Sequence, residues 1–202
     1  SSENSAAGSY LVNVSSAAER AEVIATTAQG ATTLAQDEIL TVNGVNITLS
    51  SGLDRAGVQS RINEFSGQTG VVAEDDDTTA TATRLRTEDF GSDAAISVVS
   101  NQSGANSAGF TTAIETDTGA DIAGTIGGNA ASGSGNVLTG TAGGTNGVQV
   151  QFAEAADAQV SASGALGSVT ITDNALTFQI GANQNQTVDI AIDRVNPTSL
   201  GL

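Results

Sequence analysis

The sequence predicts an α+β fold that is mainly antiparallel β, with one clear helix packed on a sheet and Gly-rich turns. Short runs of alternating apolar and polar residues, typical of half-buried strands, recur between clusters of turn residues. Only residues 51–66 show a sustained repeat of apolar side chains at helical spacing. The 202 residues include 24 Gly and a single Pro, a balance that favours tight turns over Pro-rich linkers.

The N-terminal segment carries one strand pattern and one helix signal. Tyr10–Val14 is expected to form a strand. Ser16-Ala17-Ala18-Glu19 has the spacing of a capping box, which predicts a short helix that runs through Ala21. Residues 26–37 are small and polar, and we interpret them as loop or irregular strand.

A hairpin is the clearest local signal in the interior of the chain. Asn43-Gly44 is a dipeptide typical of a two-residue hairpin turn. Residues 38–42 and 45–49 on either side of it alternate in polarity, which predicts two antiparallel strands joined by this turn.

One helix should follow the hairpin. Ser51 and Asp54 form a helix-start pattern, and Gly67 is expected to end the helix. Its predicted buried face consists of Val58, Ile62 and Phe65. Later strands are predicted at 69–73, 79–87 and 94–99.

The amino-acid sequence of this unit resembles the insertion repeat of flagellins, and related repeats occur in hook-associated and filament-cap proteins. The resemblance rests on LTVNGVNITL, RINEFSGQTGVVA and LRTEDFGSDAAISVVS. It implies structural roles and no chemical ones: Asn43-Gly44 makes a turn, Ile62 packs the helix on the sheet, and Gly70 lets the chain reverse.

Residues 101–147 are dominated by Gly, Ala, Ser, Thr and Asn, and we interpret them as a glycine-rich β-turn region. The stretch DIAGTIGGNAASGSGNVLTG is not a dinucleotide fingerprint, because it lacks a strong preceding strand and a helix after the glycines. The amino-acid sequence of this stretch also resembles that of filament-cap proteins. Strands are expected at 147–152 and 167–171.

The C-terminal segment predicts a second hairpin. Leu176–Ile180 and Val188–Ile192 alternate on either side of a Gly/Asn/Gln turn cluster. FQIGAN, the following strand and the closing Ser-Leu-Gly-Leu resemble the segment of bacterial flagellin where the filament core meets the variable outer part. This resemblance implies a filament building block.

Three regions are predicted from these patterns. Residues 10–108 are expected to form an insertion-repeat-like α+β domain. Residues 109–172 are expected to form a Gly/Thr-rich β region that completes or adjoins it, and 173–202 to form the β-hairpin that resembles the core-proximal segment of flagellin.

Composition restricts the possible chemistry. The chain has no His, Cys or Lys, so a histidine base, a thiolate, a Schiff-base amine and a Cys/His zinc site are excluded. We therefore predict that the protein is not an enzyme, with no catalytic residues, cofactor or metal ligands. The net charge of −16 opposes binding to nucleic acid and to anionic membranes. No apolar stretch approaches the roughly 18 residues that span a bilayer.

Two acidic groups are the remaining candidate sites. Glu74–Asp77 supplies oxygen ligands suited to calcium but lacks the spacing of an EF-hand loop, and we interpret it as a solvated turn. Glu115, Asp117 and Asp121 receive the same interpretation. Glycoside hydrolysis by paired carboxylates needs a cleft lined with aromatics, and the chain has few of these. The N-x-Ser/Thr pattern occurs at Asn13, Asn46, Asn101 and Asn185, as expected by chance in such a composition.

The resemblances imply a structural subunit of the bacterial flagellar filament, located outside the cell. This piece would be the surface-exposed outer part without the polymerising terminal helices, so we expect it to be a monomer by itself and to meet other flagellin subunits in the intact filament through regions absent here. The alternatives are a filament-cap or hook-associated protein and, in another class, a calcium- or glycan-binding surface adhesin module. Glycans O-linked to Ser or Thr are implied by the family and are not located by the sequence.

Overall fold

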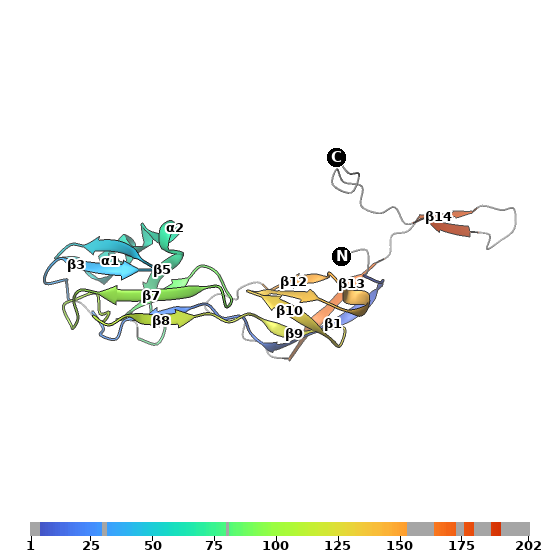
Figure 1. Ribbon diagram of the computed structural model, residues 1–202, viewed down its shortest axis with the longest axis horizontal. Helices are drawn as coiled ribbons and strands as arrows, with labels where there is room; N and C mark the ends of the chain where they lie inside the picture. The colour runs from blue at the N-terminus through green and yellow to red at the C-terminus, as the bar shows by residue number, and fades with distance from the viewer. Residues whose placement is uncertain are drawn as a thin grey trace.

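The computed structural model describes residues 5–29, 32–79, 81–152, 164–172, 176–179 and 187–190. Apart from a C-terminal hairpin, these residues form two lobes that lie end to end along the long axis of the molecule (Figure 1). Lobe A comprises the described residues from 19 to 118, and lobe B comprises those at 5–18, 119–152 and 164–172. The chain therefore starts in lobe B, passes through lobe A and returns, so that two segments cross between the lobes.

Lobe A contains two antiparallel sheets and the helices. One sheet has the order β2-β6-β5 and the other β4-β3-β7-β8. The strands are β2 (Glu22–Ile24), β3 (Glu38–Val42), β4 (Val45–Leu49), β5 (Val71–Asp75), β6 (Thr83–Thr87), β7 (Ala95–Ser100) and β8 (Glu115–Thr118), and the helices are α1 (Arg55–Asn63) and α2 (Ser66–Thr69). The strands predicted at 38–42, 45–49, 69–73, 79–87 and 94–99 are confirmed, with some ends moved by a few residues.

The turn predicted between β3 and β4 is also confirmed. Asn43 and Gly44 both have positive φ, at 47° and 81°, the backbone signature of a type I′ turn. The Asn43 side chain contributes as well, because its Oδ1 accepts the Ser97 N–H at 2.8 Å and its Nδ2 donates to the Thr69 carbonyl at 2.9 Å. This asparagine thus ties the hairpin to β7 and α2.

Helix α1 begins at Arg55, and Asp54 caps it by accepting the Gly57 N–H at 2.8 Å. The start predicted at Ser51 is therefore wrong, because residues 51 and 52 form a turn before the helix. Val58 and Ile62 are fully buried, as predicted, whereas Phe65, the third member of the predicted face, lies beyond α1 and is only partly buried. The predicted end at Gly67 is wrong. The α-helix stops at Asn63, and the short helix α2 continues to Gly70, whose φ of 69° supplies the left-handed cap.

The core of lobe A lies between its sheets and the helices. Large apolar residues dominate it, and Phe110, Leu40, Ile47, Leu49, Ile62, Leu85 and Ile96 are almost completely buried. The alternation that predicted β3 is visible in its burial, because Leu40 and Val42 face inward while Ile39 is 45% exposed.

Lobe B is a single six-stranded antiparallel sheet of order β12-β11-β10-β9-β1-β13. Its strands are β1 (Gly8–Ser16), β9 (Ala123–Ile126), β10 (Asn129–Ser134), β11 (Val137–Gly140), β12 (Gln149–Gln151) and β13 (Gly164–Ile171), with the 3₁₀ helix η1 (Gly143–Thr145) before β12. The strands predicted at 10–14, 147–152 and 167–171 and the glycine-rich β region are confirmed. β1 pairs with β13 over a separation of at least 150 residues, from Gly8↔Ile171 to Val14↔Gly164.

Close backbone contacts explain part of the glycine content of lobe B. A Cβ at Gly124 would overlap the Asn13 carbonyl oxygen on β1, and one at Gly133 would overlap the Ile122 carbonyl oxygen. The core beneath this sheet is small. Its buried members are Val12, Val14, Ala18, Ile122, Ile126 and Leu138.

The helix predicted from Ser16 through Ala21 is wrong. This segment is extended, and Glu19 forms an isolated antiparallel bridge with Ala120. The apolar face of such a helix would be mostly alanine. In the observed conformation Ala18 and Ala21 are instead fully buried in the cores of the two lobes, so tertiary packing outweighs the local capping signal.

The C-terminal hairpin is confirmed at the level of its backbone. β14 (Leu176–Gln179) pairs antiparallel with β15 (Thr187–Ile190), with Leu176 opposite Ile190 and Phe178 opposite Val188. The alternation predicted the two strands, and the structure supplies which residues lie opposite one another. The turn cluster, Ile180 and Ile192 lie outside the described residues.

These observations confirm the predicted α+β class, with 44% strand and 11% helix. The division into 10–108, 109–172 and 173–202 stays a prediction. Within the part of the chain that the structure describes, no helix is long and apolar enough to cross a membrane.

Candidate functional site

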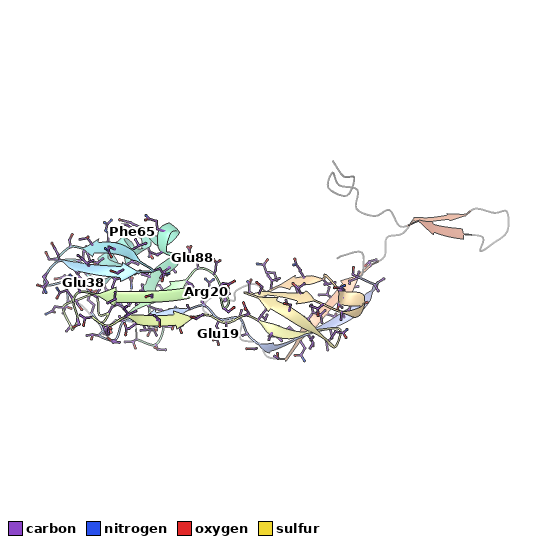
Figure 2. All side chains as sticks on the ribbon, in the orientation of Figure 1. Glu19, Arg20, Glu38, Phe65 and Glu88 are labelled. Carbon is purple, nitrogen blue, oxygen red and sulfur yellow. The ribbon has the colours of Figure 1, made fainter. Side chains whose placement is uncertain are left out.

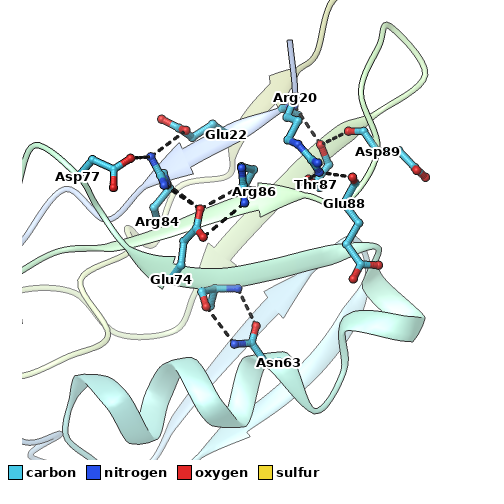
Figure 3. A network of polar contacts seen from close by, with 12 residues as sticks. Arg20, Glu22, Asn63, Glu74, Asp77, Arg84, Arg86, Thr87, Glu88 and Asp89 are labelled. Carbon is cyan, nitrogen blue, oxygen red and sulfur yellow. Dashed lines mark hydrogen bonds and ion pairs between the residues drawn. The ribbon is translucent and has the colours of Figure 1, made fainter. Parts of the chain in front are cut away.

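The acidic run at the end of β5 is held by arginines of the neighbouring strand. Glu74 accepts hydrogen bonds from Arg84 at 3.0 and 2.8 Å and from Arg86 at 3.4 Å. Arg84 also donates to Asp77 at 2.6 Å and lies 3.7 Å from a carboxylate oxygen of Glu22 on β2 (Figure 3). This group, called here the Arg84 network, spans all three strands of the β2-β6-β5 sheet.

Strand register explains why the Arg84 network forms. Arg84 lies opposite Glu74 on β5, and Arg86 lies opposite Glu22 on β2, and opposite charges on facing strands stabilise a sheet. The Arg84 side chain is only 11% exposed. Burial by itself would lower the pKa of Arg84, but the hydrogen bonds to Asp77 and Glu74 outweigh burial and raise it. Burial raises the pKa of Glu22, and the charge of Arg84 partly opposes that shift.

The two middle residues of the run point elsewhere. Asp75 accepts from Gln59 on α1 at 2.8 Å. Asp76 is buried and accepts from the Thr78 hydroxyl at 2.6 Å and from the Thr79 N–H at 2.5 Å. These bonds, that of Thr78 first, lower the pKa of Asp76 despite burial. The interpretation of Glu74–Asp77 as a solvated turn is therefore wrong in part, because its carboxylates are engaged by protein donors.

The second acidic group does not assemble. Asp117 accepts the Glu22 N–H at 2.7 Å, whereas Asp121 lies at the boundary between the lobes. The Ser92 hydroxyl, followed by the Gly135 N–H, lowers the pKa of Asp121. Among the described residues no three carboxylates converge in a way that would hold a metal ion.

A polar hollow opens where the lobes meet. Its volume is about 480 Å³. One wall carries Arg20, whose guanidinium lies 4.1 Å from the centre of the Phe90 ring and donates to the Thr87 carbonyl at 2.7 Å and to the Glu88 carbonyl. Figure 2 shows Glu19, Arg20 and Glu88 at this junction. The remaining lining is Asp89, Asp93, Asp121, Ser134, Gly135, Asn136 and Gln151.

The chemistry of these sites is structural. In the described part of the chain, these carboxylates accept hydrogen bonds from backbone N–H groups, hydroxyls, amides and arginines, and the contacts join parts of the fold. The glycine-rich stretch forms β9, β10 and β11, and among the described residues only the three-residue 3₁₀ helix η1 follows it, so its glycines do not lead into an α-helix whose N-terminus could bind a phosphate. Asn46 and Asn101 of the N-x-Ser/Thr patterns bond within the fold, to the Thr41 hydroxyl and to the Ile39 N–H. Asn185 lies outside the described residues.

Sequence reasoning missed two groups of residues. Arg20 and Phe90 form one of them: they meet Asp121, which the sequence indicated only as a member of an acidic group, and this junction joins segments far apart in the chain that carry no local signal of it. Glu38 is the other, and the sequence did carry a signal for it: Glu38 lies two residues before Leu40 on an alternating strand, so both side chains face the core. It is 1% exposed, and its carboxylate accepts from the Ser100 hydroxyl at 2.6 Å and from the Ala108 N–H at 2.8 Å.

Comparison with known proteins gives a fold relationship. No family model and no curated protein matches the chain. Among solved structures, the D2–D3 domains of the flagellar cap protein FliD from Escherichia coli share 18% identity, over 86% of this chain and 92% of that one, with a TM-score of 0.54. FliD from Pseudomonas aeruginosa is 18% identical over 86% of this chain and 83% of that one, with a TM-score of 0.51.

The similarity covers both lobes, since the shared part amounts to most of the described chain. A longer Escherichia coli fragment with domains D1–D2–D3 is 19% identical over 85% of this chain, with a TM-score of 0.53, and this chain spans 51% of that fragment. At this identity the finding concerns the fold: the chain has an α+β fold similar to that of the D2–D3 domains of flagellar cap proteins.

Proposed function

We propose that this chain is the outer part of a flagellar cap protein, equivalent to the D2–D3 domains of FliD. The observation that carries the proposal is the extent of the structural similarity, which covers 86% of this chain and 92% of the Escherichia coli fragment and so extends into both lobes. A similarity limited to one lobe could be explained by a β module that is common in unrelated proteins. Filament-cap proteins were one of the alternatives raised by the insertion-repeat resemblance.

The described residues support a structural role. The buried Glu38 carboxylate accepts hydrogen bonds within lobe A, and Asp121 joins the two lobes by accepting the Ser92 hydroxyl. We infer that the protein lies outside the cell at the flagellum and meets flagellin subunits through parts of the protein beyond this chain.

Flagellin itself is the second candidate. FQIGAN and the strand after it favour it, and β14 and β15 pair as an antiparallel hairpin in this segment. The two candidates differ in where the protein lies, because a cap occupies one end of a filament and flagellin forms its whole length.

Immunogold microscopy of the full-length protein on flagella of the source bacterium tests the proposal. Antibodies raised against this chain should label the filament end only. Labelling along the filament would show flagellin and overturn the cap proposal, and absence of label on flagella would overturn both candidates. Cells in which the gene is deleted provide the antibody control.

A further inference from the structure

Two extended segments cross between the lobes and pair with each other. The Glu19 N–H donates to the Ala120 carbonyl at 2.8 Å, and the Ala120 N–H donates back to Glu19 at 3.1 Å. A double connection restricts rotation more than a single linker does, because both segments must twist together. The loop of lobe A before β7 bonds to both crossing segments. The Gly91 N–H donates to the Glu19 carbonyl at 3.0 Å, and the Gly119 N–H donates to the Ala94 carbonyl at 2.9 Å.

One carboxylate joins the two lobes directly. Asp121, at the start of the return into lobe B, accepts the Ser92 hydroxyl of lobe A at 2.6 Å. Its other oxygen accepts the Gly135 N–H of lobe B at 2.7 Å and the Ser92 N–H at 3.3 Å. A carboxylate that accepts several donors from two bodies holds them at a defined separation.

Glycines allow the backbones to meet at this point. A Cβ at Gly119 would lie 2.7 Å from the Gly91 carbonyl oxygen and closer still to that of Glu19. A Cβ at Gly91, whose φ is 105°, would lie 2.8 Å from the Gly135 Cα and would overlap Asp121. Three glycines from three segments are thus packed backbone to backbone, which leaves little space for the lobes to swing.

Arg20 closes the other side of the joint. It lies on the first crossing segment, and it stacks on Phe90, which packs against the core of lobe B. The same guanidinium donates to the carbonyls of Thr87 and Glu88 in lobe A (Figure 3). The loop between β6 and β7 is therefore fixed to both lobes.

We propose that this joint makes the two lobes a single rigid arm, with Asp121 as the latch and the contact of Gly91, Gly119 and Gly135 as the stop. The inference concerns how lobe A is held relative to lobe B and does not depend on the proposed function. In a protein exposed at the cell surface, such a joint fixes the direction in which the acidic lobe A projects.

Interlobe distances measure this rigidity. The chain has no Cys, so Ser60→Cys on α1 and Ser132→Cys on β10, both exposed positions in different lobes, give a single pair of spin labels. Double electron–electron resonance on this otherwise wild-type chain should show one narrow distance peak. A broad distribution would overturn the proposal.

Two substitutions should release the joint. Asp121→Ala removes the latch, and Gly119→Ala introduces the Cβ that the crossing cannot hold. Each should replace the narrow peak by a broad or shifted distribution, while amide exchange shows that both lobes remain folded. A peak as narrow as that of the parent in both variants would contradict the proposal.

Matched controls separate these effects from generic ones. Asp93→Ala removes a carboxylate from the same hollow, and Gly67→Ala adds a Cβ where no atom lies within 4 Å. Both should keep the narrow peak, and a broad peak in both would contradict the assigned roles. If Asp121→Ala or Gly119→Ala unfolds a lobe, Ser92→Ala removes only one donor to the latch. The Ser92→Ala variant should give a distance peak broader than that of the parent, and an unchanged peak would contradict the role assigned to Asp121.

Discussion

Lobes A and B are both built from antiparallel strands, but different interactions stabilise them. Between Glu19 and Thr118 the chain carries 15 carboxylates and 5 arginines, a net charge of −10, whereas Asp121 is the only charged side chain in the described part of lobe B. Lobe A has seventeen buried residues in its core cluster and lobe B has six. A large core and paired charges thus stabilise lobe A, whereas lobe B relies on a thin core and close backbone packing.

This difference shows that antiparallel sheets in one chain can carry a strongly charged surface in one lobe and a nearly uncharged surface in the other. Lobe A tolerates its acidic residues because arginines and backbone donors engage several of them, as in the Arg84 network. Lobe B avoids charge and fills its surface with Ser, Thr, Asn and Gly. We therefore expect lobe A to depend on pH and on ion pairs, and lobe B to depend on a few apolar side chains.

The largest expected effect lies in the thin core. Leu138→Ala should destabilise lobe B by about 2–5 kcal/mol, because it opens a cavity in a cluster with few other large members. The fluorescence of Tyr10 reports this lobe, since the chain has one Tyr and no Trp and Tyr10 packs on this core. In urea the Tyr10 transition should move to lower concentration while amide protection in lobe A persists.

The control for that substitution is Leu11→Ala, because Leu11 is 55% exposed. It should shift the same transition by no more than about 0.5 kcal/mol. Equal losses of lobe A and lobe B in the Leu138→Ala variant would show that the lobes unfold as one unit and would remove the contrast between them.

The buried carboxylate of lobe A gives the next effect. Glu38→Met should cost about 1–3 kcal/mol, because the Ala108 N–H would lose its acceptor inside the fold. Glu38→Gln keeps one acceptor and should recover most of that loss. Amide exchange of β3 and β7 measures both, and a methionine variant as stable as wild type would show that the loop before Phe110 does not depend on this contact.

Loss of the arginine at the centre of the Arg84 network should have a smaller effect. Arg84→Met leaves Glu22, Glu74 and Asp77 without their shared partner and should destabilise lobe A by about 1–2 kcal/mol, a value below that of a fully buried pair because the carboxylates are partly exposed. Arg61→Met is the matched control. Arg61 pairs with Glu64 at the surface, and its loss should cost about 0.5 kcal/mol or less. Similar urea midpoints for the two variants would argue against a special role of the network.

The smallest effect concerns pH. A carboxyl whose pKa is lowered by folding, as in Asp76, adds stability above its unfolded pKa of about 4, and this stability is lost as the pH falls through the folded value. Glu22 acts oppositely: its raised pKa adds stability below the unfolded value that is lost as the pH rises through the folded one. Asp76→Asn should therefore flatten the acid loss of lobe A stability below about pH 4, as measured by urea unfolding followed by circular dichroism. Asp93→Asn should leave that profile unchanged, and identical profiles for wild type and Asp76→Asn would contradict the assignment.

Local patterns predicted the pieces of this fold well where their cause is local. Asn43-Gly44 needs positive φ at both positions, and this requirement is the same in any protein. The buried face of α1 follows from helical spacing at Val58 and Ile62. The prediction was wrong where a distant segment forms hydrogen bonds with the backbone in question. Residues 16–21 carry a helix-capping pattern, but Glu19 pairs with Ala120 and the segment is extended.

The sequence by itself determined the strand periods, the register of the hairpin around Asn43-Gly44 and the absence of histidine, cysteine and lysine chemistry. The tertiary structure alone decided that β1 pairs with β13 and β9, and that Asp121 meets Ser92 between the lobes. The physical reason is that periodicity and turn propensity act over a few residues. Strand partners and a carboxylate's donors are chosen by packing between segments that the chain brings together only when it folds.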